Sequence, residues 1–159
     1  MKIYIDLLFI NMKIETYSIE VEKNTSLKQA KELLQKTSYV YPEEQMWFCD
    51  NNNMVEQKCM DWNTTSRYSI IVNNKWYNFN IKTITNLSIS IDHLTSRDQI
   101  STIKYHIYEK VKLSPESYKL TFIKKNEVKE LRDNDVIGQY FIPNESTINL
   151  VIKLNSGLK

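Results

Sequence analysis

The chain repeats one order of predicted elements, and this repeat limits the folds that its 159 residues can adopt. Each half begins with two stretches in which apolar and polar residues alternate, at 3–7, 17–21, 77–81 and 87–91. Such alternation is typical of half-buried strands, so each pair of stretches predicts a β-hairpin. A helical pattern and further strands follow in the same order in both halves. The sequence therefore predicts two units of one architecture.

A helix is predicted after each hairpin. In the first half, Ser26 and Gln29 form a capping box ahead of a run with helical spacing that extends to about Lys36. In the second half, Asp98 is the expected N-cap, and apolar residues recur at helical spacing over 100–107. A helix with one apolar stripe buries that stripe against another layer. Each half is therefore expected to place one helix on its sheet.

The remaining strands complete the two predicted sheets. Third and closing strands are predicted at 45–49, 68–72, 118–122 and 148–152. Because the connection between hairpin and closing strand contains the helix, the opening and closing strands must be parallel neighbours. This is an α+β arrangement of the β-grasp type. We expect two tandem domains, 1–73 and 76–155, and a flexible tail, 156–159.

Turns and short segments separate these strands. Asn51–Asn53 is expected to form a turn, and Val128 is expected to anchor a short fourth strand in the second half. The boundary between the domains is expected within Val72–Lys75.

The second half resembles ubiquitin over nearly its whole length. Four segments carry the similarity: the helix around 100–107, the proline loop at 113–116, the turn at 138–140 and the closing segment at 145–157. Within the helix, Lys104 stands at the position of ubiquitin's buried lysine. The first half is more distant and matches at 26–34, 42–45 and 61–63. A chain with two such domains is similar to the interferon-induced tandem ubiquitin-like modifier of vertebrates and to bacterial ubiquitin-like modifiers of antiphage defence operons.

The resemblance implies a reactive C-terminal tail. Ubiquitin-like modifiers end in small residues because narrow enzyme channels approach the backbone closely. Gly157 matches the final glycine of that pattern, while Ser156 replaces the penultimate one. Leu158 and Lys159 extend past Gly157, so the resemblance implies a processing protease that cuts after Gly157. The alternative is a terminus without function that contains a glycine by chance.

Two lysines stand at positions that activating enzymes read in the family. Lys153 takes the place of an arginine at the start of the tail, and Lys119 is a second basic residue beside it on the third strand. Lysine keeps the charge but lacks the planar fork of arginine, so a dedicated activating enzyme is expected. For Lys119, a solvated surface charge is the simpler interpretation.

The apolar recognition face of ubiquitin has counterparts in both halves. In the second half they are Thr121, Asn149 and Val151, which form a largely polar surface. In the first half they are the apolar residues Met46, Phe48 and Ile71. Two apolar residues that lead to the hairpin tip, Leu8 and Phe9, join them. Such a face either packs on the second domain or binds a partner protein.

Composition argues against several other functions. The 21 basic and 19 acidic residues are scattered and give a net charge of +2, so no nucleic-acid or membrane partner is expected. The two glycines exclude a Gly-rich phosphate loop, and no nucleotide or other cofactor is expected. The absence of a signal-like apolar start and the low cysteine count favour a cytoplasmic protein.

Catalytic and metal sites are not expected either. His106 is predicted on the outer helix surface and His93 in the loop ahead of the helix, and neither forms a recognised pattern with an acid or a thiol. Cys49 and Cys59 are expected to be reduced core residues without metal-binding spacing.

Two functions therefore remain. The first is a modifier that activating and conjugating enzymes join through its C-terminal carboxylate to amines of target proteins, and that a deconjugating or processing protease matures; a role in antiviral or antiphage defence follows from the resemblance. The second is an interaction module that uses ubiquitin-like surfaces for docking and is not conjugated.

Overall fold

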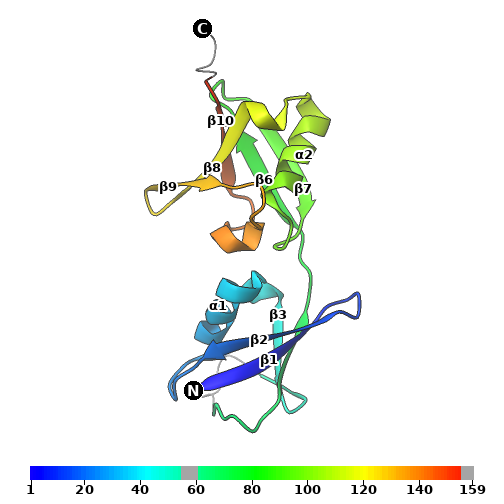
Figure 1. The fold of residues 1–159 in the computed structure, drawn as a ribbon, viewed down its shortest axis with the longest axis vertical. Helices are drawn as coiled ribbons and strands as arrows, with labels where there is room; N and C mark the ends of the chain where they lie inside the picture. The colour runs from blue at the N-terminus through cyan, green and yellow to red at the C-terminus, as the bar shows by residue number, and fades with distance from the viewer. Residues whose placement is uncertain (55–60, 155–159) are drawn as a thin grey trace. The chain divides into compact units, whose positions relative to one another are not determined.

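The computed structural model describes residues 1–54 and 61–154, and these form two compact units, Met1–Lys75 and Trp76–Lys159, here called unit 1 and unit 2. The predicted repeat is confirmed, because each unit holds one mixed five-stranded sheet and one α-helix (Figure 1).

Unit 1 contains the predicted hairpin, helix, third strand and closing strand, together with two short elements, a 3-10 helix and a further strand. In chain order the elements are β1 (Lys2–Leu8), β2 (Ile14–Glu20), α1 (Leu27–Ser38), the 3-10 helix η1 (Pro42–Glu44), β3 (Gln45–Cys49), β4 (Asn52–Asn53) and β5 (Tyr68–Val72). The order of strands in the sheet is β2-β1-β5-β3-β4, and β1 and β5 are parallel. The predicted parallel contact between the opening and closing strands is therefore confirmed.

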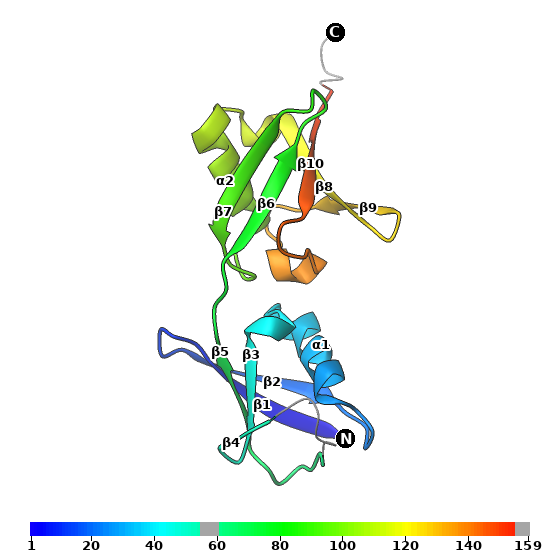
Figure 2. The same ribbon diagram turned by 180° about the vertical axis from the view of Figure 1, so that it is seen from behind.

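Unit 2 repeats this order. Its elements are β6 (Tyr77–Lys82), β7 (Ser88–Leu94), α2 (Ile100–Val111), η2 (Pro115–Ser117), β8 (Tyr118–Lys124), β9 (Glu127–Leu131), η3 (Ile137–Tyr140) and β10 (Thr147–Ile152). The order of strands is β7-β6-β10-β8-β9, with β6 and β10 parallel. Figure 2 shows β7, β6, β10 and β8 side by side with α2 behind them.

The core of each unit lies between its sheet and its helix. In unit 1, alternate residues of β1 pack with the apolar stripe of α1, from Leu27 to Leu34. In unit 2, Ile103 of α2 and Leu150 of β10 are both buried, as the periodicities predicted. Lys104 is only 5% exposed, and its ammonium lies 2.7 Å from a carboxylate oxygen of Asp133.

The first helix is capped as the sequence predicted. Ser26 is the N-cap of α1, and its hydroxyl accepts a hydrogen bond from the Gln29 N–H at 3.2 Å. The Gln29 side-chain oxygen in turn accepts from the Ser26 N–H at 2.8 Å. These two bonds satisfy backbone donors that an uncapped helix would leave open.

The second helix corrects the prediction that Asp98 is its N-cap. The N-cap is Gln99, and it makes no side-chain capping bond. The N–H groups of Ile100 and Ser101 instead donate to the backbone carbonyls of Asp135 and Asp133, at 2.8 and 3.1 Å. The Asp98 carboxylate accepts from the Thr95 N–H at 2.8 Å and so orders the preceding turn.

Two other local predictions were wrong in position. The turn predicted at Asn51–Asn53 consists of Asp50 and Asn51, both with positive φ, while Asn52 and Asn53 pair with β3 as β4. Asp and Asn tolerate this conformation, which two-residue hairpin turns require. His93 lies in β7 and not in a following loop, at an irregularity where Asp92 and His93 together face Asn78 of β6.

The β9 strand is longer than the short strand expected around Val128, because it pairs with β8 over five residues. Cys49 is partly buried and packs against the core of unit 1, whereas Cys59 lies outside the described residues.

Candidate functional site

The strand that leads to the tail is held on both sides. β10 pairs with β6 in parallel and with β8 in antiparallel orientation, so it is a central strand of unit 2. After its last residue, the Lys153 N–H still donates to the Ser117 carbonyl at 2.9 Å. Leu154, the last described residue, is 93% exposed. The chain therefore leaves the sheet at a fixed point, and the predicted processing residues Ser156 and Gly157 lie outside the described residues.

The two predicted recognition lysines lie on one face of the sheet, next to this exit. Lys119 is the cross-strand partner of Val151, and side chains two residues apart on a strand point to the same face. The register therefore brings Lys119 and Lys153 to neighbouring positions. Lys153 is exposed and Lys119 is half-buried.

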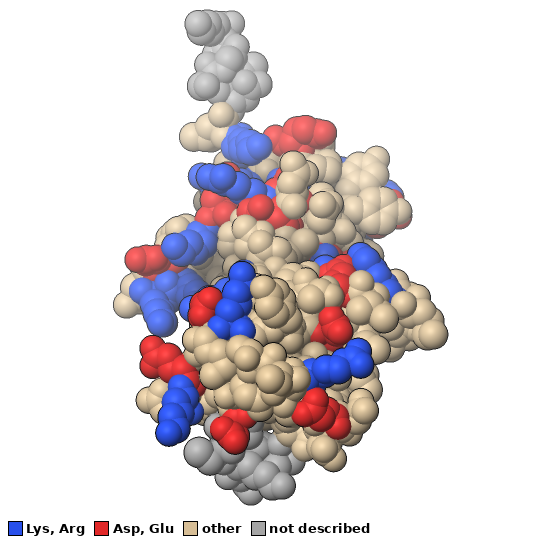
Figure 3. Space-filling view, turned by 60° about the horizontal axis from the view of Figure 1, so that its bottom comes forward, with Lys and Arg blue, Asp and Glu red and all other residues tan. Residues whose placement is uncertain are grey.

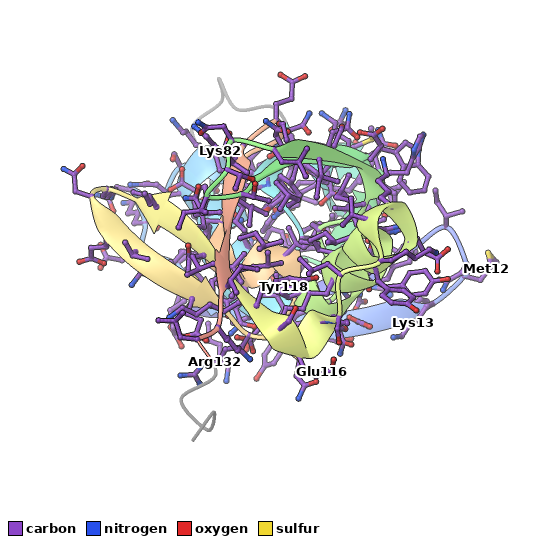
Figure 4. The ribbon with its side chains drawn as sticks, turned by 90° about the horizontal axis from the view of Figure 1, so that it is seen from above. Met12, Lys13, Lys82, Glu116, Tyr118 and Arg132 are labelled. Atoms are coloured by element: carbon purple, nitrogen blue, oxygen red, sulfur yellow. The ribbon has the colours of Figure 1, made fainter. Side chains whose placement is uncertain are left out.

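A carboxylate accompanies these lysines. Glu116 lies in η2, just ahead of β8, and Figure 4 shows it at the periphery of unit 2. A hydrogen bond from the Ser114 hydroxyl lowers the pKa of Glu116, and the positive charges of Lys104 and Lys153 act in the same direction. The exit of the tail is therefore a mixed surface of lysines and one ionised carboxylate.

Tyr118 lies behind this surface, in the core. It is the cross-strand partner of Ile152, and the Lys104 ammonium lies 5.4 Å from the centroid of its ring. Its hydroxyl is buried and has no hydrogen-bond partner among the described residues. Burial raises the pKa of Tyr118 to about 12, and the carboxylates of Asp133 and Glu116 add to this effect.

The predicted apolar face of unit 1 is present as a row across four strands. In the register of the sheet, Ile14 opposes Leu8, Leu8 opposes Ile71, and Ile71 opposes Met46. All four side chains are exposed, by 36% to 61%. Cross-strand neighbours of this kind lie about 5 Å apart, so the row is continuous.

Three further apolar residues define the limits of this row. Phe48, two residues after Met46 on β3, is half-buried on the same face. Phe9 is partly buried and packs against the core, so it does not extend the row. Met12 lies at the tip of the β1–β2 hairpin, and Figure 4 shows its side chain pointing away from the sheet.

Ile14 is the member of the row that the sequence did not identify. Ile14 is out of phase with the alternation of Tyr17, Ile19 and Val21, so its side chain lies on the opposite face of β2. Its place opposite Leu8 depends on the length of the turn, which only the register shows.

An open groove of about 370 Å³ borders the row. It is lined by Leu8 and Ile14 on the apolar side, and by Asp6, Asp50 and Arg67 on the polar side. The Asp50 carboxylate accepts from the Arg67 N–H at 2.8 Å. This bond and one to Ser66 lower the pKa of Asp50, so the groove presents an ionised carboxylate at neutral pH.

The corresponding face of unit 2 is polar, as predicted, with one difference. Asn149 and Thr121 oppose each other across β10 and β8, but Thr121 is buried. Val151 is exposed on this face, and further exposed apolar side chains lie at the outer edge of the sheet, where Ile123 opposes Val128. Sequence reasoning did not identify this pair.

In the part of the chain that the structure describes, neither charged side chains nor metal-ligand geometry indicates a second site. Figure 3 shows basic and acidic side chains interspersed on the face that it displays. Within residues 1–54 and 61–154, no group of three or more His, Cys, Asp or Glu side chains could hold a metal ion. His93 packs edge-on against Trp76, and His106 is partly exposed on α2. No helix in the described part of the chain has the length and hydropathy needed to cross a membrane.

Comparison with known families agrees with the architecture. Residues 79–155 match the model of the Ubiquitin family, a range that begins within β6 and extends past β10. Unit 1 lies outside the matched range but has the same strand order and the same covering helix. The chain is a tandem of two ubiquitin-like β-grasp domains.

Proposed function

We propose that the chain is a ubiquitin-like protein modifier that is joined to target amines through the carboxylate of Gly157. The observation that carries this proposal is the fixed exit of the chain from a central strand, in the domain that matches the Ubiquitin family. Lys153 and Leu154 extend from that exit and are exposed. A tail held at its root can enter an enzyme channel without unfolding of the domain.

The chemistry requires a free carboxylate on a residue without a side chain. A protease first hydrolyses the bond between Gly157 and Leu158. An activating enzyme then joins the carboxylate to the AMP portion of ATP with release of pyrophosphate, and its cysteine displaces AMP to form a thioester. A target amine displaces the thiolate, which leaves an isopeptide bond. Every enzyme here is a partner, and the chain supplies the acyl group.

Several features support particular partners. Lys153 and Lys119 share one face at the exit, so they are the proposed contacts for the activating enzyme, with Ser156 and Gly157 in its channel. The proposed domain limits are 1–73 and 76–155, with 156–159 as the tail. The system is proposed to act in the cytoplasm, in antiviral or antiphage defence, on protein targets.

A tagged chain expressed in its own cells tests this proposal. The expected products are a species whose intact mass ends at Gly157 and slower-migrating adducts that resist thiol reduction, as an isopeptide does. Gly157→Ala should suppress the adducts, whereas Lys23→Arg, at an exposed position of unit 1, is the control and should leave them unchanged. Undiminished adducts from a chain that ends at Ile152 would exclude the tail as the reactive element.

The second candidate is a docking module that is not conjugated. The apolar row of unit 1 favours it, because exposed apolar residues that adjoin one another are typical of protein contacts. Met46→Ser with Ile71→Ser should then remove partner binding while the fold is retained. If partner binding is lost and no adduct forms from the parent chain, the docking module is the better assignment.

A further inference from the structure

The outer edge of the unit 2 sheet is a hairpin that projects from the domain. Among the described residues, β9 is the outermost strand, and it pairs with β8 over five residues. The corresponding pairing in unit 1, between β3 and β4, covers two residues. Figure 1 and Figure 2 both show the β8–β9 hairpin extending away from the rest of unit 2. A long edge strand offers unpaired backbone groups to a further strand, whereas a very short one does not.

The turn of this hairpin determines which backbone groups are unpaired. Lys125 and Asn126 both have positive φ, as in a two-residue turn of type I′. In such a hairpin the flanking residues, Lys124 and Glu127, exchange both backbone hydrogen bonds, and non-bonded and bonded pairs alternate from there. Val128 therefore belongs to a non-bonded pair. Its N–H and C=O groups point away from β8, toward the free edge.

The bonds on the other side of β8 give the same orientation. The Lys153 N–H donates to the Ser117 carbonyl at 2.9 Å, so these two residues form a bonded pair at the start of the ladder between β8 and β10. Alternation along β8 then directs the backbone groups of Ile123 to the β10 side, away from its β9 partner Val128. The pair of Ile123 and Val128 is therefore non-bonded.

The side chains at this edge combine an apolar pair with two opposite charges. Ile123 and Val128 oppose each other on one face of the hairpin and are 54% and 66% exposed. Glu127 and Lys129 flank Val128 on the other face, with the ammonium 3.2 Å from the carboxylate, and both side chains are exposed. The edge therefore has an apolar face and a face on which one acid and one base alternate.

A second copy of β9 fits this edge in one antiparallel register. A two-fold axis at Val128 makes the two Val128 residues a bonded pair, which exchanges two main-chain hydrogen bonds. Glu127 of each copy then opposes Lys129 of the other. An axis at Glu127, Lys129 or Glu130 instead brings two like charges directly opposite each other, which is destabilising. The charges of β9 are thus complementary to themselves in the register that its outward backbone groups permit.

We propose that unit 2 binds a second copy of this chain edge to edge through β9, so that the two five-stranded sheets join. Ile123 and Val128 of both copies then form a continuous apolar row on one face, and two ion pairs between Glu127 and Lys129 lie on the other. The exit of the tail, where Ile152 pairs with Tyr118, is about 17 Å along β8 from Ile123. The inference therefore does not depend on the proposed function.

Sedimentation of the full chain tests this proposal, in reducing buffer that keeps the Cys49 thiol free. Because the contact is small, the expected dimer has a dissociation constant on the order of 100 μM. Dilution should shift the backbone amide resonances of β8 and β9. A chain that stays monomeric at about 1 mM, or shifts centred on the apolar row of unit 1, would overturn the proposal.

Proline substitutions test the backbone contact. Val128→Pro removes the outward N–H without breaking a bond to β8, so it should abolish the dimer in a folded chain. Ser90→Pro is the matched control on β7, the other edge of the same sheet. The Ser90 N–H also points outward, because its partner Asn80 donates to Ser146 on the β10 side. The Ser90 carbonyl already accepts from the Lys110 ammonium at 2.6 Å, and this control should leave the dimer unchanged.

Two charge variants test the register. Glu127→Lys and Lys129→Glu each bring two pairs of like charges together in the dimer, so each variant alone should self-associate at least about tenfold more weakly than the parent. A mixture of the two variants restores both pairs of opposite charges and should form a mixed dimer about as strong as that of the parent. Failure of the mixture to associate would overturn the register and the proposal with it.

The same charge changes elsewhere separate the β9 contact from net charge. Glu22→Lys and Lys23→Glu lie at exposed positions of unit 1 and should leave self-association unchanged. Equal weakening by these two variants would overturn the proposal. If Val128→Pro does not fold, the mixture of charge variants decides. A dimer that Met46→Ser with Ile71→Ser abolishes, and that Val128→Pro does not, would assign self-association to the apolar row of unit 1 and would also overturn the proposal.

Discussion

Replacing Tyr118 by phenylalanine is expected to stabilise unit 2, although the residue is fully buried. Its hydroxyl has no hydrogen-bond partner among the described residues. Burial of an unsatisfied polar group costs about 1–3 kcal/mol, and phenylalanine removes that cost. The ring and its contact with Lys104 remain in the variant. The free energy of unfolding of unit 2 should therefore rise by about 1–3 kcal/mol.

Tyr68 in unit 1 is the matched control. Its hydroxyl accepts from the Asn63 N–H at 3.0 Å and donates to the Asn63 carbonyl at 3.2 Å. Tyr68→Phe loses both bonds and leaves two backbone groups without these partners. It should lower the free energy of unfolding of unit 1 by about 1–3 kcal/mol. The same substitution is thus expected to have opposite signs at the two positions.

The pH dependence gives a second readout for Tyr118. The pKa of its hydroxyl is raised from 10.0 to about 12 by burial and by the carboxylates of Asp133 and Glu116. Above pH 10 the unfolded chain loses this proton while the folded chain retains it, so stability falls as pH rises toward 12. The contribution is complete below pH 10. The advantage of Tyr118→Phe over the parent should therefore increase in this alkaline range.

Urea unfolding followed through resolved amide resonances of each unit measures both effects, since the two units need not unfold together. The absorbance of deprotonated tyrosine, measured against pH, follows the titration of the tyrosines. The titration step that is present in the parent and absent in Tyr118→Phe belongs to Tyr118. A loss of stability of more than about 1 kcal/mol in Tyr118→Phe would refute the reasoning, because it would mean that the hydroxyl is hydrogen-bonded in solution.

Three further substitutions test the packing and the caps. Ile103→Ala should lower the free energy of unfolding of unit 2 by about 2–5 kcal/mol in urea, because it leaves a cavity in the core; a change within error of zero would contradict its burial. Ser26→Ala should cost unit 1 about 1 kcal/mol through loss of the capping bond, while Ser26→Gly should cost less. Asp133→Asn should lower the free energy of unfolding of unit 2 by about 1.5–3 kcal/mol, since it leaves the buried ammonium of Lys104 without its anion. If high salt lowers the free energy of unfolding of the parent by the same amount, the two residues form a screened surface pair instead.

The elements of the fold were predictable because they depend on neighbours in sequence. Alternation determines which side of a strand is apolar, and the capping box at Ser26 and Gln29 needs residues only three apart. Once a helix stands between a hairpin and a closing strand, chain geometry requires the parallel contact seen between β1 and β5 and between β6 and β10. The apolar face of unit 1 was expected from the resemblance to ubiquitin, at the positions that correspond to its recognition face.

The errors and omissions involve contacts between distant residues. The start of α2 is satisfied by the carbonyls of Asp133 and Asp135, so the strong local capping signal of Asp98 was not needed there. The bulge at His93 depends on how β7 fits β6. Thr121 is buried although its cross-strand partner Asn149 is polar. In each case the contact that decides the structure comes from residues distant in the sequence, which a local sequence pattern does not include.

The sequence by itself determined the two units, the strands and helices, and the apolar or polar character of each face, because these follow from periodicity and local hydrogen bonding. Only the tertiary structure decided which side chains meet across strands. The row from Ile14 to Met46, the bond from Lys110 to Ser90 and the unpartnered hydroxyl of Tyr118 all depend on register and packing. Register is a relation between strands far apart in the chain, and a shift of one residue would reverse every face.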